Sequence, residues 1–381
     1  MRLLIDYRAA LRQPSGVGEY ARQLVAGLLA RKKEAALELD MTIFSSSWKD
    51  RLTLPEDMNG VTVIDQRIPV SLLNFTWHRL GWPAAETLTD GVFDIVHSLH
   101  PLLLPSRSAA QVITIHDLNF LDHPERTRAE VRRDYAPLAK AHAERADAIV
   151  APSHFTAREV ERRLGITADR VVVCPPSAPA WEPRRANPVD GYILFVGTLE
   201  PRKNVGMLLD AYERLLARTF PGGSPIPDLV LAGGARPEAA GWLERLERPP
   251  LAGRVRHIGY VDPVRRHALY EGARLLAQPS FEEGFGLPAL EAMTAGVPVV
   301  AANRGAAPEV VGEAGLLVDP EDPEQMAAAI GRLLDDPGLA AACATAGIAQ
   351  SRRFGSSAMA EQALKAYALA IARHARRSPL T

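Results

Sequence analysis

The amino-acid sequence predicts an α/β protein made of two doubly wound parallel sheets. The 381 residues exceed the roughly 100–200 residues of one typical domain. Short apolar runs alternate with amphipathic helical stretches, and one proline-rich break divides this alternation into two halves. Strands that are connected through helices pair in parallel, with both faces of the sheet covered.

Seven apolar runs of the first half predict buried strands, at 2–7, 41–46, 61–65, 94–98, 112–117, 148–153 and 171–175. The clearest helix is expected over 17–30, because its apolar residues recur at helical spacing. These residues are Val17, Ala21, Leu24, Val25, Leu28 and Leu29.

The stretch 175–191 carries five prolines among small and polar residues, which is typical of an interdomain linker. Six further strands are expected after it, at 192–197, 229–234, 255–260, 273–280, 297–302 and 315–319. We therefore expect an N-terminal domain over 1–180 and a second domain over 181–360. A C-terminal helix over 361–381 is expected to pack back towards the first domain.

Composition excludes several classes of protein. The formal net charge is -1, which gives no reason to expect nucleic acid as a partner. The two cysteines, Cys174 and Cys343, stand far apart, so we expect neither a disulfide framework nor a structural zinc site. The opening MRLLIDYRAA is too charged for a signal peptide, and no apolar run reaches the ~18 residues of a membrane span. A cytoplasmic protein is expected, at most bound to the inner face of the membrane.

A first candidate site lies in VGTLEPRKNVGMLLDAY, 196–212. A strand is expected to end at Gly197, and Asn204 is expected to be the N-cap of the next helix. Arg202 and Lys203 would then precede a helix N-terminus, where the dipole disfavours cations unless an anion binds there. Arginine and lysine are suited to gripping a phosphate group.

A second candidate site is QPSFEEGFGLP, 278–288, followed by a helix. Its glycines allow close approach of a ligand, and the N–H groups near Phe285, Gly286 and Leu287 form a second anion cradle. Glu283 lies before the turn and Glu291 one turn into the helix. A glycosidase needs two carboxylates across a scissile bond, which residues of one turn and its helix are poorly placed to supply.

These residues carry a family resemblance. The stretch 279–320, PSFEEGFGLPALEAMTAGVPVVAANRGAAPEVVGEAGLLVDP, resembles the donor-binding signature of retaining glycosyltransferases of family 4. The signature has two glutamates separated by seven residues, here Glu283 and Glu291, and GTLEPRKN stands at the expected place upstream. The resemblance implies the GT-B fold, with two Rossmann-like domains facing across a cleft. The first domain would bind the acceptor and the second a sugar nucleotide.

The resemblance also implies roles for single residues. Glu291 would accept hydrogen bonds from the ribose, and Glu283 would hold hydroxyls of the transferred sugar. The amides at Phe285–Leu287 would contact sugar and phosphate, and Arg202 and Lys203 would neutralise the diphosphate. Many relatives have an arginine where this chain has Thr198.

The stretch QPSGVGEYARQL, 13–24, allows two interpretations. Gly16 to Ala21 matches a GxGxxA dinucleotide fingerprint, with Asp40 about 20 residues on, which would indicate an NAD-dependent oxidoreductase. The fingerprint, however, directly follows its strand in such folds, and here the strand 2–7 ends nine residues before Gly16. The resemblance instead makes Gly16 and Gly18 a loop over the donor diphosphate, and it adds Val261 to the donor-binding residues.

VITIHDLNF, 112–120, places His116 at the carboxyl end of a strand, where ligands of such sheets bind. A single histidine there is most often structural, and the resemblance places such a histidine against the transferred sugar. His97 and His100 allow two interpretations, residues that line the acceptor side or ordinary loop histidines, and the second is favoured.

The resemblance implies a retaining hexosyltransferase of polysaccharide biosynthesis that acts on a glycan or lipid-linked acceptor. The chain has no Asp-x-Asp triplet, so neither a metal nor another cofactor is expected. GDP-mannose is the favoured donor, before UDP-glucose and dTDP-rhamnose, and a nucleotide-sugar epimerase is the alternative. The basic stretches 31–33 and 126–146 would allow peripheral contact with an anionic membrane, although interleaved acidic residues favour a solvated helix face.

Overall fold

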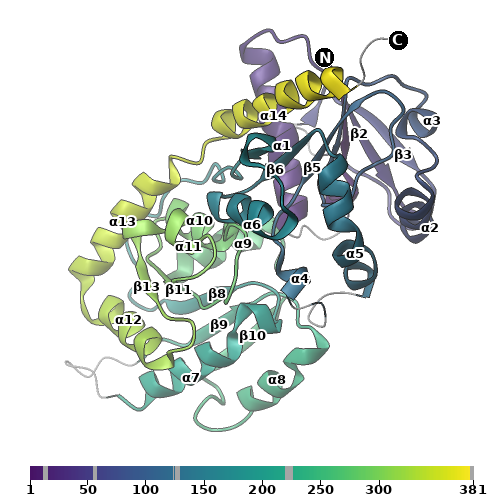
Figure 1. Ribbon diagram of the computed structural model, residues 1–381. Helices are drawn as coiled ribbons and strands as arrows, with labels where there is room; N and C mark the ends of the chain where they lie inside the picture. Colours follow the sequence, from purple (N-terminus) through teal and green to yellow (C-terminus); the bar gives the residue numbers. More distant parts are fainter. Residues whose placement is uncertain (12–15, 55–57, 123, 125–128, 219–225, 378–381) are drawn as a thin grey trace. The chain divides into compact units, whose positions relative to one another are not determined.

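The computed structural model describes residues 1–11, 16–54, 58–122, 124, 129–218 and 226–377, with the side chains of 129–134 left out. These residues form two compact units (Figure 1). The first contains the described residues up to Ser177 and those from Gly355 onwards, and the second runs from Ala178 to Phe354. The sequence suggested boundaries at 180 and 360.

The first unit contains a parallel sheet in the order β3-β2-β1-β4-β5-β6-β7. Its strands are β1 (Arg2–Asp6), β2 (Asp40–Ser46), β3 (Thr62–Gln66), β4 (Ile95–Ser98), β5 (Ala110–Thr114), β6 (Ala148–Ala151) and β7 (Val171–Val173). Its helices are α1 (Gly16–Glu34), α2 (Val70–Phe75), α3 (Ala85–Thr89), α4 (Asn119–Asp122), α5 (Ala129–Arg145), α6 (His154–Leu164) and α14 (Ser356–Arg377). Its short helical turns are η1 (Arg8–Ala10), η3 (Thr76–Leu80) and η5 (Ala168–Arg170).

Successive residues of β1 face opposite sides of this sheet, and both sides are buried. Leu3 and Ile5 pack among residues of α1 and α14, whereas Leu4 packs with residues of α2 and η3. Figure 1 shows α14, the last helix, lying beside α1. A side chain at Gly27 would meet the backbone oxygen of Ser356 at 3.0 Å, so this glycine allows the two helices to pack closely.

The second unit repeats the pattern, in the order β10-β9-β8-β11-β12-β13. Its strands are β8 (Tyr192–Val196), β9 (Leu229–Ala232), β10 (Val255–Gly259), β11 (Ala273–Gln278), β12 (Val299–Ala302) and β13 (Leu316–Val318). Its helices are α7 (Val205–Leu216), α8 (Ala240–Leu246), α9 (Pro263–Gly272), α10 (Leu287–Thr294), α11 (Ala307–Val310), α12 (Pro323–Asp335) and α13 (Pro337–Ser351). Short turns cover η6 (Pro201–Lys203), η7 (Pro237–Ala239) and η8 (Gly312–Ala314).

Both sheets reverse their strand order next to their first strand, between β1 and β4 and between β8 and β11. In open parallel sheets, ligands bind at such a point, outside the carboxyl ends of the strands. All thirteen predicted strands are present, with ends shifted by a few residues. The predicted helix 17–30 lies within α1, with its expected apolar face buried except for half-buried Val17.

The expected linker 175–191 is largely part of the second unit, which corrects the prediction for most of its length. The Trp181 ring stacks on the His267 ring at 4.5 Å. The Arg184 side chain donates to the backbone oxygens of Gly296, at 3.1 Å, and Ala273. Two large side chains thus anchor a segment whose composition resembles that of a flexible linker.

Three further expectations concern single residues or segments. Cys174 and Cys343 are both free and buried. No helix in the described ranges is long and apolar enough to cross a membrane. Of the basic stretch 126–146, residues 126–128 and the side chains of 129–134 lie outside the described part, and the rest belongs to α5 and the turn after it.

Candidate active site

The site of the second unit lies where β8 and β11 end side by side. The chain leaves β8 at Gly197, passes through η6 and enters α7. It leaves β11 at Gln278, passes through Glu283 and enters α10. Because the two strands are parallel neighbours, the two predicted motifs meet at one edge of the sheet.

Glu283 is a buried carboxylate that three side chains hold. Ser280 Oγ and Lys203 Nζ donate to its Oε1 at 2.7 and 2.5 Å, and Arg202 Nη1 lies 3.4 Å from Oε2. Burial raises the pKa of Glu283, but the charges of Lys203 and Arg202 and the hydrogen bonds from Lys203 and Ser280 outweigh it and lower the pKa to about 2. The side chain is therefore a charged acceptor at neutral pH and not a proton donor.

The loop that carries Glu283 is fixed by its backbone. The backbone N–H and carbonyl of Glu283 lie close to Gly305, and a Cβ on Gly305 would come within 2.7 Å of both. Gly305 has a φ of +64°. Phe281 N donates to Arg202 O at 3.0 Å, which ties the two motifs together. At position 305, only glycine allows both the left-handed backbone conformation and the close approach of the Glu283 backbone.

Asn204 lies at the N-cap position of α7, as predicted, but it does not cap the helix with its side chain. Its φ is +55°, and its Nδ2 donates to Pro279 O and Pro320 O at 3.1 and 2.7 Å. The side chain thus joins three loops at the carboxyl edge of the sheet. The reason is that a left-handed N-cap residue turns its amide away from the first helical N–H groups.

The structure surrounds Arg202 and Lys203 with carboxylates, which the sequence did not indicate. Glu200 Oε1 lies 3.1 Å from Arg202 Nη2, and Arg236 Nε lies 3.5 Å from Glu200 Oε2. Together with Glu283, the cluster contains three cations and two anions. The expected cationic site in front of α7 therefore keeps only a small excess of positive charge.

Glu291 lies on α10 and belongs to a different network. Arg266 Nη2 lies 3.0 Å from its Oε1, and the Tyr270 hydroxyl donates to its Oε2 at 2.8 Å. Burial, together with the neighbouring Glu291 carboxylate, raises the pKa of Tyr270 well above its usual value, so the phenol stays protonated. Arg266 and Tyr270 are four residues apart on α9, which places both on one face of the helix.

The glycine turn between the two glutamates has the predicted form. Gly286 has a φ of +98° and is the N-cap residue of α10, and Pro288 occupies the first turn. The Phe285 ring meets the Phe354 ring edge-on at 5.3 Å. Leu287 begins α10, and half-buried Val261 lies in the short connection between β10 and α9.

The remaining predicted residues, His116, Gly16 and Gly18, belong to the first unit. His116 is half-buried after β5; its Nε2 donates to Leu99 O at 3.3 Å, and its ring meets the Tyr20 ring of α1 edge-on at 5.0 Å. Burial lowers the pKa of His116 to about 4, so the imidazole is neutral at pH 7.

Gly16 and Gly18 lie in the first turn of α1, so they are helical and not part of a loop. A Cβ on Gly18 would come within 2.8 Å of Ala9 O, which shows close packing against η1. Because β1 ends at Asp6, the GxGxxA match does not follow its strand directly, and the geometry of a dinucleotide fingerprint is not met.

Two family models match the chain. The model described as glycosyltransferase family 4 matches residues 14–180, and the model described as glycosyl transferases group 1 matches residues 190–336. The chain is 31% identical over 377 residues to the O-antigen chain mannosyltransferase B of Escherichia coli, which covers 93% of this chain and 96% of that protein. The chain belongs to glycosyltransferase family 4.

Further relatives agree with this assignment. The D-inositol 3-phosphate glycosyltransferase of Acidothermus cellulolyticus is 31% identical over 400 residues, covering 94% of this glycosyltransferase and 86% of that protein. Sucrose-phosphate synthase from Thermosynechococcus elongatus has a TM-score of 0.76 at 23% identity, over 96% of this chain and 98% of that chain. HepE of Anabaena, solved with UDP and glucose, has a TM-score of 0.69 at 19% identity over the same shares. The glycosyltransferase has the GT-B fold.

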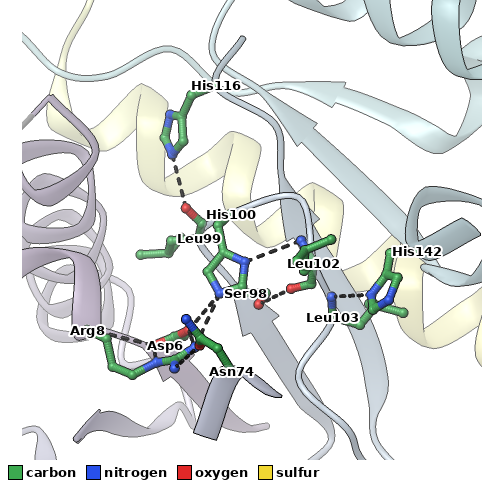
Figure 2. A network of polar contacts seen from close by, with 10 residues as sticks. All are labelled: Asp6, Arg8, Asn74, Ser98, Leu99, His100, Leu102, Leu103, His116 and His142. Carbon is green, nitrogen blue, oxygen red and sulfur yellow. Dashed lines mark hydrogen bonds and ion pairs between the residues drawn. The ribbon is translucent and has the colours of Figure 1, made fainter. Parts of the chain in front are cut away.

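The first unit of the glycosyltransferase contains a polar network at the carboxyl ends of β1 and β4 (Figure 2). The sequence did not indicate this network. Asp6 accepts two hydrogen bonds from the Arg8 guanidinium, at 2.8 and 2.7 Å, and one from the Arg8 backbone N–H, at 3.1 Å. Its Oδ2 also lies 3.1 Å from His100 Nε2. Arg8 also donates to Asn74 at 2.8 Å and lies 4.7 Å from the centre of the Trp77 ring. Asp6 directly ends a buried strand, which is the signal that makes such a residue a candidate.

Of the two histidines expected in loops, one lies in a strand. His97 lies in β4 and not in a loop, and it is fully buried. Its Nδ1 lies 2.9 Å from the Tyr367 hydroxyl, and its Nε2 lies 2.8 Å from Thr114 Oγ1. Burial lowers its pKa to about 3. His100, in the loop after β4, is part of the Asp6 network. In the described part of the glycosyltransferase, no group of three or more His, Cys, Asp or Glu side chains is placed to hold a metal ion.

Proposed function

We propose that the glycosyltransferase transfers mannose from GDP-mannose to a hydroxyl of a glycan or lipid-linked acceptor, with retention of the anomeric configuration and without a metal ion. Its similarity to an O-antigen mannosyltransferase extends over nearly the whole chain, which supports a mannosyl donor. UDP-glucose and dTDP-rhamnose are the competing donors. The second unit binds the donor and the first unit the acceptor.

The observation that carries the donor site is the separation of two buried glutamates into two networks on either side of one glycine turn. A sugar nucleotide has hydroxyls at both ends, on its ribose and on its sugar, with the diphosphate between them. Glu291 is oriented by Arg266 and Tyr270 and accepts from the ribose hydroxyls. Glu283 accepts from hydroxyls of the sugar, because it stays ionised well below neutral pH.

The diphosphate lies at the turn between the glutamates. The N-terminus of α10 attracts it through the helix dipole and through backbone N–H groups near Phe285–Leu287. Lys203 is a three-fold donor that uses one N–H for Glu283. Together with Arg202 it stabilises the charge that develops on the leaving group.

In the reaction, the bond from the sugar C1 to the phosphate oxygen breaks and a bond to the acceptor oxygen forms on the same face. The departing diphosphate oxygen takes the acceptor proton, so no protein side chain needs to be a covalent nucleophile. His116, neutral at pH 7, contributes a hydrogen bond to the transferred sugar and not a charge. Isolation of a mannosyl–enzyme intermediate would contradict this sequence of events.

The test offers GDP-mannose, UDP-glucose and dTDP-rhamnose in turn, in the presence of EDTA, with synthetic mannoside and lipid-pyrophosphate acceptors. The proposal predicts acceptor-dependent release of GDP and an α-linked product by NMR. Release of another nucleotide would exclude the mannosyl donor, and a β-linked product would exclude retention. Loss of transfer in EDTA would exclude metal independence, and interconversion of free sugar nucleotides would indicate an epimerase.

A further inference from the structure

An apolar surface in the first unit belongs to none of the sites above. Its large members come from two segments, 48–49 and 70–82, and each exposes between 54% and 70% of its surface. They are Trp48, Leu72, Phe75, Leu80 and Trp82. We call these five residues the Trp82 surface. At about 150–250 Å² for each large ring, its three aromatic residues alone expose roughly 300–480 Å², as much as the largest apolar patch of a typical monomer.

The two segments of the Trp82 surface are connected through the backbone. Ser47 N donates to Gln66 O at 3.1 Å, and Ser46 Oγ donates to Ile68 O at 2.8 Å. The chain before Trp48 therefore runs beside the residues that lead directly into α2. This places Trp48 next to the start of the helical segment 70–80, which carries Leu72, Phe75 and Leu80 and is followed by Trp82 two residues later.

The helical segment formed by α2 and η3 is apolar on two sides, whereas a surface helix normally has one polar side. Its inner side carries Leu73 and Trp77, which are buried, and the Trp77 ring lies 5.5 Å from the Phe44 ring. Its outer side carries Leu72 and Phe75, three residues apart and both exposed. The inner side accounts for the packing of the helix, and the outer side needs another explanation.

The charges around the Trp82 surface are mostly positive, although half-buried Asp50 stands between Lys49 and Arg51. Lys49, Arg51, Arg67 and Arg79 are exposed in or beside its two segments. No Asp or Glu occurs from 66 to 85, although the whole chain has 45 acidic and 44 basic residues. Asp65, just before this stretch, is largely buried beside Arg51, with 3.1 Å between their charged groups.

We propose that the Trp82 surface docks the protein onto an anionic lipid bilayer. Tryptophan rings prefer the boundary between lipid and water, and arginine and lysine are attracted by anionic head groups. The helical segment of 11 residues, 70–80, is about 16 Å long and so lies in the interface and does not cross a core of about 30 Å. A second copy of the chain fits this surface less well, because a two-fold contact would bring the same arginines together.

The surface differs from the basic stretches 31–33 and 126–146 that the sequence pointed to for membrane contact. Residues 31–33 lie in α1 and are followed by Glu34, and the described part of the second stretch, α5, carries acidic residues such as Glu144 among its basic ones. The Trp82 surface instead combines exposed rings with positive charge, and its longer segment, 70–82, contains no acidic residue. The proposal does not depend on the identity of the sugar donor.

The test is cosedimentation of the full chain with sucrose-loaded vesicles of phosphatidylglycerol and phosphatidylcholine in equal parts. We expect binding that weakens at least tenfold in Phe75→Ser/Trp82→Ser, and that weakens in Lys49→Gln/Arg67→Gln and at high salt. The matched control is Val189→Ser/Val264→Ser, which changes the two valines of the second unit that expose more than 80% of their surface. This control should bind as the unchanged protein does.

Equal binding by Phe75→Ser/Trp82→Ser, or equal binding to pure phosphatidylcholine vesicles, would overturn the proposal. A second result would also overturn it: the unchanged protein does not bind the vesicles but forms a dimer in sedimentation equilibrium, and Phe75→Ser/Trp82→Ser does not form this dimer. Far-UV circular dichroism establishes that each variant is folded. A GDP thermal shift on the same samples tests the donor site of the second unit, so a failure of vesicle binding and a failure of the proposed function are distinguishable.

Discussion

Replacing Lys203 by methionine tests how the buried Glu283 carboxylate is stabilised. The pKa of Glu283 lies at about 2 instead of its ordinary 4.5. Because one pKa unit corresponds to about 1.36 kcal/mol, the ionised side chain contributes about 3 kcal/mol to folding at neutral pH. Lys203 Nζ, at 2.5 Å, is the cation nearest to it. Methionine keeps the apolar stem that packs against Gly197 and removes the charge.

The sign of the pH effect follows from the depressed pKa. In the unchanged protein, the contribution of Glu283 is fully present above pH 4.5 and is lost only as the pH falls towards 2. It is therefore constant between pH 7.5 and 5. In Lys203→Met the carboxyl loses its main partner, its pKa rises, and the variant regains stability on protonation. We expect a loss of about 2–3 kcal/mol at pH 7.5 and about 1 kcal/mol less at pH 5.

The assay is urea unfolding at both pH values, followed by hydrogen exchange of peptides from the second unit. Glu283→Gln serves as the control, because it removes the charge that needs a partner. The double variant Lys203→Met/Glu283→Gln should then lose less stability than the two single variants lose in sum, by about 1–3 kcal/mol. Additive losses, or the same loss at both pH values, would refute the ion pair as the cause.

Three further variants test other parts of the structure. Gly305→Ala should have a lower melting temperature than Gly312→Ala and should lower transfer activity. Both glycines have positive φ, but only a Cβ at 305 would collide with the Glu283 backbone, at 2.7 Å. Equal melting temperatures of the two variants would contradict this. Because the pKa of His116 is about 4, kcat/KM of the unchanged protein and of His116→Gln should have parallel pH profiles between pH 6 and 8; a limb that only the unchanged protein shows would contradict the neutral imidazole. Tyr367→Phe should destabilise the first unit by about 1–2 kcal/mol in urea unfolding, since it removes a hydrogen bond to a buried histidine; an unchanged midpoint would count against that bond.

The sequence predicted the strands well because buried parallel strands are short apolar runs between turn residues, a local property. Their order in the sheets is not local. The pairing of β1 with β4, and not with β3, depends on packing between residues about 90 apart. The segment 178–191 was misjudged for the same reason, since proline content is visible locally, whereas the stacking of Trp181 on His267 is tertiary.

The candidate site shows the same division. Glu283, Glu291, Arg202 and Lys203 stand in motifs whose spacing is recognisable, and the structure brings Glu283 together with the two cations. Their partners were not predicted. Tyr270 lies on another helix, 21 residues before Glu291. Only the packing of α9 beside the carboxyl edge makes such residues part of the site.

The central claim is that two glutamates hold the two ends of one sugar nucleotide, and calorimetric titration with GDP tests it most directly. GDP contains the ribose and the diphosphate but no sugar. We predict that Glu291→Gln raises the Kd of GDP about tenfold or more, as expected for losing hydrogen bonds to a charged group. Glu283→Gln should leave the Kd nearly unchanged while slowing mannose transfer. Equal changes of the GDP Kd in both variants, or no change in either, would contradict the account.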